Sequence, residues 1–253
     1  MSLVLLEKED RGFLSSLAAI PSTFKGTRPR KISAADWHRT ENQGPMGSCR
    51  GNSGTSVLEK LAFVRNKSRV QLSRIFFYLA TQKIDGLLGG DRGCTISNGF
   101  KLMLETGCPL EESTGYPGSY PGSTERQQVL ASENYAAGAP FKALSVRQAP
   151  TEYDDVCDVV AGGGAIDFGI MWSGIPSDRV IRNWRPGNGG HANWIAGYDD
   201  DRRMYEAWNS HGDGLYWITP EAWKQMMAHR WTAAGAVFGQ TEPEFVNWTE
   251  GYL

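Results

Sequence analysis

The sequence predicts an α+β protein of two lobes, with helices in the first half of the chain and strands in the second. Apolar residues recur at helical spacing up to about residue 105, whereas after residue 140 short apolar runs are separated by turn residues. A segment rich in glycine, proline, serine and tyrosine, 109–140, joins the two halves. Helices followed by strands are typical of α+β folds. The 253 residues are enough for a sizeable core.

The first half is expected to hold an N-terminal arm and a helical lobe. Residues 1–35 carry prolines and charged groups and predict a solvated arm, while 36–140 form the lobe. The glycine- and proline-rich stretch 43–47 cannot be helical, and the apolar repeat that follows it begins a helix. Ser73 is typical of a helix cap and Gly107 of a helix end. Helices are therefore expected over 49–66, 74–85, 97–105 and 125–130.

The second half predicts a lobe built mainly of strands, over 141–240, and a tail over 241–253. Its strand-like runs are short and bounded by turn residues. They cover 141–146, 165–171, 192–198, 204–208, 214–218 and 233–238. Two helices interrupt them, over 151–160 and 220–229.

Charge and composition exclude some classes of function. Charged residues make up 21% of the chain and the net charge is -2, so neither a nucleic-acid surface nor a polybasic membrane anchor is expected. No run approaches the ~18 apolar residues of a membrane span. The apolar start of the chain is too short for a secretory signal. A cytoplasmic protein is therefore expected, with association with a virion as the alternative if the chain comes from a phage.

The cysteines and histidines indicate neither a metal site nor a cofactor. The chain has four cysteines (Cys49, Cys94, Cys108 and Cys157), and no pair of them has the C-x-x-C spacing of a metal site. The four histidines are scattered. Because the cysteine count is low and no signal peptide is seen, we favour unbridged thiols over disulfides.

Cys49 is the candidate nucleophile. It lies where the turn-rich stretch becomes a helix, and a thiol there faces free backbone N–H groups and the positive end of the helix dipole. Both favour the thiolate, so an activated thiol is expected at this position.

Three further residues supply what a nucleophilic cysteine needs. His191 follows two glycines and precedes an apolar run, so it is expected on a strand as the base. Asn209 ends the next strand and can orient the imidazole by accepting its ring N–H. The Gln43 side-chain amide, with the backbone N–H of Cys49, can hold the oxyanion of a tetrahedral intermediate. Each residue alone is more often structural, but the four together match one mechanism.

These motifs resemble those of the papain-like cysteine peptidases. The stretch Gln43-Gly-Pro-Met-Gly-Ser-Cys49 is similar to their Q-G-x-C-G-S-C motif. Gly190-His191-Ala192 resembles the histidine motif, and Asn209-Ser-His-Gly resembles N-S-W-G. The distances along the chain from Cys49 to the histidine and the asparagine also fit this family, with Asn209 slightly late.

The resemblance implies a two-lobed fold with Cys49 on a helical lobe, facing His191 on a β-barrel-like lobe across a cleft. It implies hydrolysis of a polypeptide substrate through a thioester acyl-enzyme, without a cofactor. Gly93 and Cys94, with the loop that follows them, are similar to the family's substrate-groove segment and imply backbone hydrogen bonds to the substrate.

The sequence also departs from the family pattern. Met46 replaces a disulfide cysteine, which implies that the family's bridge to the Cys94 region is absent. Arg50 replaces the aromatic residue after the nucleophile, and it is expected either to lower the pKa of Cys49 or to turn to solvent. Asn52 makes the start of the helix more polar, and His211 replaces the tryptophan that covers the histidine–asparagine bond.

Two alternative functions stay open at this point. The departures favour a catalytically weak or inactive papain-like fold that serves as a binding or structural protein, for example in a virion. The second alternative is an amidase of cell-wall peptides or an isopeptidase. A protein partner bound through the N-terminal arm or the C-terminal tail is also open, because the tail carries several aromatic residues.

Overall fold

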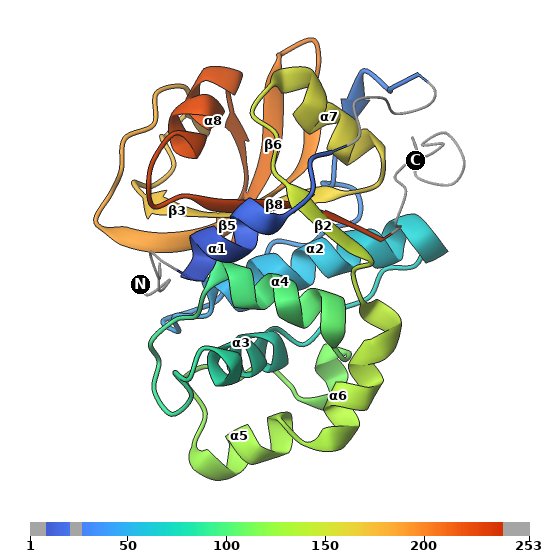
Figure 1. Cartoon of the computed structure of the whole chain (residues 1–253), viewed down its shortest axis with the longest axis vertical. Coiled ribbons are helices and arrows are strands. Elements are labelled where there is room, and N and C mark those ends of the chain that lie inside the picture. The colour runs from blue at the N-terminus through green and yellow to red at the C-terminus, as the bar shows by residue number, and fades with distance from the viewer. Residues whose placement is uncertain (1–8, 21–26, 240–253) are drawn as a thin grey trace.

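The computed structural model describes residues 9–20 and 27–239 and shows a helical lobe packed against a lobe built on one sheet (Figure 1). The helical lobe holds five helices: α2 (Cys49–Asn66), α3 (Arg74–Ile84), α4 (Ile96–Glu105), α5 (Ser123–Val129) and α6 (Ser132–Gly138). Two short 3-10 turns, η1 (Glu111–Ser113) and η2 (Ala139–Phe141), lie in the same region. The bounds predicted for α2 are confirmed, and those of α3 and α4 are confirmed to within one residue.

Helix α2 runs between the two lobes (Figure 1). Every residue from Cys49 to Phe63 is buried, including charged ones such as Glu59 and Lys60. On one side it packs against α3, and on the other against two central strands of the sheet. Because its first residue is Cys49, this helix places the candidate nucleophile at the junction of the lobes.

The second lobe is a mixed sheet covered by helices on its outer face. Its strands are β1 (Lys31–Ile32), β2 (Ser145–Gln148), β3 (Ala165–Trp172), β4 (Val180–Ile181), β5 (Gly189–Asp199), β6 (Met204–Asn209), β7 (Gly214–Ile218) and β8 (Ala233–Phe238). Their order is β2-β8-β3-β5-β6-β7-β4, with β1 paired to β5, and every pair but β4–β7 is antiparallel. The outer helices are α7 (Tyr153–Ala161) and α8 (Pro220–Met227).

Two predictions for this part of the chain are wrong. The described part of the arm is not solvated, because α1 (Glu9–Ser16) packs against α4 and β8, and β1 pairs with β5. Phe13, Leu14 and Leu17 lie partly buried against the core. The strand expected over 141–146 begins only at Ser145, because Pro140, with its fixed φ, lies within the preceding 3-10 turn, Ala139–Phe141. The predicted tail over 241–253 lies outside the described residues.

None of the described helices is both long and apolar enough to cross a membrane. Two apolar cores support the lobes: one surrounds α2, α3 and α4 and reaches the inner face of the sheet, and the other lies between the sheet and helices α7 and α8. The candidate site lies where α2 meets β5, at the boundary of these cores.

Candidate active site

Cys49 is the first residue of α2 and its side chain is 1% exposed. The turn before it passes through Gly44, whose φ of +63° is a conformation that favours glycine. Burial raises the pKa of the Cys49 thiol to about 11, and this outweighs the backbone N–H groups of Ala192 and Arg50, which lower it. The predicted thiolate is therefore wrong for the resting site, because desolvation acts more strongly here than the helix start.

His191 lies on β5 and is fully buried. Its Nε2 lies 2.6 Å from Asn209 Oδ1, an atom that only accepts hydrogen bonds, so Nε2 carries the proton. Nδ1 is buried and has no hydrogen-bond partner among the described residues. Burial, followed by the charge on His211, lowers the pKa of His191 to about 3, so the imidazole is neutral at rest.

The Cys49 thiol lies beside the strand that carries the imidazole of His191. Ala192 directly follows His191 on β5, and its backbone N–H faces the Cys49 sulfur. The sulfur is thus held beside the strand position of His191, whose Nδ1 is available to accept a proton. This arrangement combines an uncharged nucleophile with an uncharged base.

Asn209 ends β6 and is bonded through both atoms of its amide. Oδ1 accepts from His191 Nε2 and from the backbone N–H of Ser210 at 2.9 Å. Nδ2 donates to Asp213 Oδ1 at 2.6 Å. The sequence did not point to Asp213, because a carboxylate in a glycine-rich turn carries no signal of its own.

Gln43 lies beside the same loop and is held in place by several bonds. Its Nε2 donates to the carbonyl of Met46 at 2.7 Å, and its Oε1 accepts from Ser210 Oγ at 2.7 Å. Its backbone N–H donates to the carbonyl of Ser210 at 2.8 Å. Because an amide nitrogen carries two hydrogens, one N–H of Gln43 is left for an oxyanion.

Aromatic rings cover the imidazole of His191. His211 stacks on it with ring centroids 4.3 Å apart and an interplanar angle of 25°. Trp172 packs at 4.9 Å on a tilted plane. His211 stands where the resemblance implies a tryptophan, and it places a second imidazole over that of His191. Burial lowers the pKa of His211, and the charge of Asp213 opposes this.

Arg50 is fully buried, so the expectation that it turns to solvent is wrong. Its guanidinium forms an ion pair with Asp167 on β3, which is also fully buried. The rings of Phe77 and Phe100 lie 5.1 Å from it. Its charge lowers the pKa of Cys49, but less than burial raises it.

Gly93 and Cys94, predicted to contact a substrate, are turned toward the protein. The N–H of Gly93 donates to Tyr78 Oη and its carbonyl accepts from Gln82 Nε2, both at 3.0 Å. Cys94 is completely buried. Their groups are thus occupied in this structure, and the predicted substrate contacts stay a prediction. The four cysteines are buried thiols, and none forms a disulfide within the described residues.

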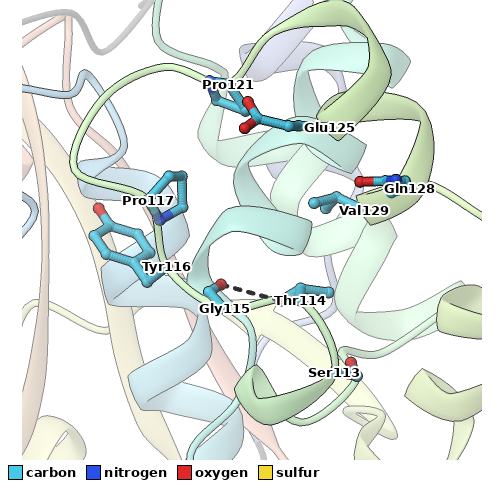
Figure 2. Close-up of a pocket in the computed structure, with 9 residues that line it drawn as sticks. All are labelled: Ser113, Thr114, Gly115, Tyr116, Pro117, Pro121, Glu125, Gln128 and Val129. Atoms are coloured by element: carbon cyan, nitrogen blue, oxygen red, sulfur yellow. Dashed lines mark hydrogen bonds between the residues drawn. The ribbon is translucent and has the colours of Figure 1, made fainter.

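A pocket of about 430 Å³ lies on the helical lobe, between the segment 113–121 and α5 (Figure 2). Tyr116 lies at its edge, and its Oη is 2.7 Å from Ser48 Oγ and donates to the carbonyl of Gln43 at 3.2 Å. The wall of the pocket is therefore connected to the turn that leads into Cys49. In the described part of the chain, no three His, Cys, Asp or Glu side chains are grouped as a metal site requires.

Solved structures of several cysteine proteases are similar to this chain. Xylellain from Xylella fastidiosa gives a TM-score of 0.70 at 21% identity, over 88% of this chain and 92% of its own. CMS1MS2 from Carica candamarcensis gives 0.60 at 18%, over 86% and 99%. Digestive procathepsin L 3 of Tenebrio molitor gives 0.62 at 13%, over 94% and 80%.

At these identities the similarity concerns the fold. It confirms the predicted two-lobed α+β architecture. No protein-family model and no curated protein matches the chain.

Proposed function

We propose that this chain, which has the two-lobed fold of the papain-like cysteine peptidases, hydrolyses peptide bonds of a polypeptide substrate through a thioester at Cys49. The observation that carries the proposal is the state of His191. Its Nε2–H is bonded to Asn209, its Nδ1 has no partner among the described residues, and the next residue of its strand contacts the thiol sulfur. A base oriented in this way is what a neutral thiol needs.

The first half of the reaction forms the thioester. Cys49 Sγ attacks the carbonyl carbon while its proton moves to His191 Nδ1, and the carbonyl electron pair moves to oxygen. The backbone N–H of Cys49 and the second N–H of Gln43 Nε2 hold that oxyanion. When it collapses, the C–N bond breaks and the imidazolium gives its proton to the leaving amine.

The second half releases the acid. A water molecule gives a proton to His191 Nδ1 and attacks the thioester carbon. The second tetrahedral intermediate collapses with loss of the sulfur, which takes the proton back from His191. Throughout, Asn209 Oδ1 accepts the Nε2–H and so keeps Nδ1 directed at the reacting atoms.

Hydrolysis of a peptide library by the whole chain tests the proposal. Cys49→Ala is expected to abolish turnover while leaving the circular dichroism spectrum unchanged. Cys157→Ala removes a buried thiol from α7 and should keep full activity, which makes it a matched control. Turnover that survives in Cys49→Ala would refute the assignment.

One observation favours a second function, that of a binding protein with little activity. Cys49 and His191 are 1% and 0% exposed, and a peptide must reach both for hydrolysis. A wild-type chain that is folded, binds a protein and cleaves no peptide would support this alternative. Hydrolysis that depends on Cys49 would exclude it.

A further inference from the structure

We propose that Asp213 is a positioning residue of this site: its carboxylate fixes the Asn209 amide in the orientation that accepts from His191, and its charge stabilises the imidazolium that forms during the reaction. The inference rests on the proposed function for its catalytic consequence. Its structural part, the orientation of Asn209 and the proton position on His191, can be tested without any turnover.

The contacts of Asn209 show why the carboxylate decides its orientation. As placed, Nδ2 meets the Asp213 carboxylate at 2.6 Å, while Oδ1 meets two donors, His191 Nε2 and the Ser210 N–H. If the amide rotated by half a turn, its nitrogen would face both donors and its oxygen would face the carboxylate. All three contacts would then be unfavourable, so the rotated state is excluded as long as Asp213 is charged.

The loop between β6 and β7 is built to bring Asp213 back onto Asn209. Asn209 is paired with Gly214 at the end of the hairpin, and Asp213 lies between two glycines with positive φ, +82° at Gly212 and +67° at Gly214. A Cβ at Gly214 would lie 2.6 Å from Thr40 Oγ1, so the loop is packed tightly against the segment before Gln43.

Two backbone bonds hold this packing in place. The Gly212 N–H donates to the Glu41 carbonyl at 3.0 Å, and the Gln43 N–H donates to the Ser210 carbonyl at 2.8 Å. One loop therefore carries the orienting amide, the hydroxyl that holds Gln43 and the carboxylate that holds the amide.

The charge of Asp213 matters because the resting site holds no formal charge on the thiol or the imidazole. Proton transfer to His191 creates a buried cation, and a buried cation is costly unless it is paired. Asn209 connects this cation to Asp213 through two bonds of 2.6 Å. The carboxylate polarises the amide and increases the negative character of Oδ1, which strengthens its bond to the imidazolium.

The other titratable or charged groups around this chain of bonds do not replace Asp213. His211 stacks on His191, and any charge it carries opposes the imidazolium. Arg179 donates to the backbone carbonyl of Asp213 at 2.6 Å. Tyr216 on β7 interacts with Asp213 and is held neutral by burial, as is Cys49 on α2.

Two substitutions separate the position of the amide from the charge. Asp213→Asn keeps an acceptor oxygen for Asn209 Nδ2 and removes the charge, whereas Asp213→Ala removes both. We expect kcat to fall roughly 10–100-fold in Asp213→Ala, by analogy with the carboxylates that support metal-binding histidines, and less in Asp213→Asn. KM should change little, because Asp213 acts through Asn209. Asp178→Ala, which removes an exposed carboxylate beside Arg182, is the control and should leave kcat unchanged.

Nitrogen NMR of ¹⁵N-histidine-labelled protein gives the readout that does not need turnover. Wild type and Asp213→Asn are expected to show His191 with its proton on Nε2, and Asp213→Ala a mixture of the two tautomers. An unchanged kcat and an unchanged tautomer in a folded Asp213→Ala variant would overturn the inference. If the wild type hydrolyses nothing, the proposed function fails, while the tautomer of Asp213→Ala still decides whether Asp213 orients the site.

Discussion

Replacing Asp167 by leucine is expected to lower the free energy of unfolding by about 3–5 kcal/mol, because it leaves Arg50 as a buried charge without its partner. Both side chains are 0% exposed. The guanidinium would keep the rings of Phe77 and Phe100 and one hydrogen bond of 3.3 Å to the carbonyl of Ile96. Neither replaces a carboxylate, because a neutral contact does not offset the desolvation of a full charge.

The double variant Arg50→Met/Asp167→Leu supplies the critical comparison. Replacing both partners by apolar residues of similar volume should restore the wild-type free energy of unfolding or exceed it by about 1–4 kcal/mol. Urea unfolding followed by tryptophan fluorescence measures the free energy of unfolding of each variant. In thermal unfolding, the single variant should have a melting temperature about 6–20 °C below that of wild type.

Asp178→Ala breaks an exposed ion pair with Arg182, which water and salt screen, so this variant should keep a free energy of unfolding close to that of wild type. If Asp167→Leu is as stable as this control, or if the double variant is no more stable than the single one, the guanidinium is not buried as a charge.

Two further predictions concern Glu59, which is buried in α2, and Gln43, which lies before Cys49. Burial, followed by the charge of Glu41, raises the pKa of Glu59 to about 8 from an ordinary 4.5. Its contribution to stability is thus complete below pH 4.5 and is lost as the pH rises through 8. Between pH 5 and 7 the free energy of unfolding of the wild type should therefore fall by up to about 1.4 kcal/mol per pH unit because of Glu59. Glu59→Gln should not show this fall. Urea midpoints that fall equally in both proteins would contradict this. Gln43→Ala should lower kcat by roughly 10²–10³ with little change in KM, and an unaltered kcat would remove Gln43 from the oxyanion site.

Much of the fold follows from local patterns in the chain. The turn before Cys49 and the apolar repeat after it define the start of α2, and the cap at Ser73 defines the start of α3, with its hydroxyl accepting from the Phe76 N–H at 3.0 Å. Segments that are held in place by distant parts of the chain are harder to predict from the sequence. Helix α1 and strand β1 are short, and each is held by packing or pairing with a remote part of the chain.

In the candidate site, too, some features follow from the sequence and others depend on the whole fold. Sequence order was enough to select Cys49, His191, Asn209 and Gln43, which the structure brings to one junction. It could not show that burial reverses the expected ionisation of the thiol, since burial depends on the whole fold. Nor could it show Asp213, whose proposed role exists only through its bond to the Asn209 amide.

The most direct test of the account is to trap the covalent intermediate. Wild-type protein is mixed with a peptide ester, quenched in acid within the first turnover and analysed by intact-mass and peptide mass spectrometry. We predict one acyl group per chain, located on Cys49, removed by hydroxylamine as a thioester is, and missing from Cys49→Ala. An acyl group on Cys94, Cys108 or Cys157, or turnover with no acyl group on any cysteine, would contradict the assignment of Cys49 as the nucleophile.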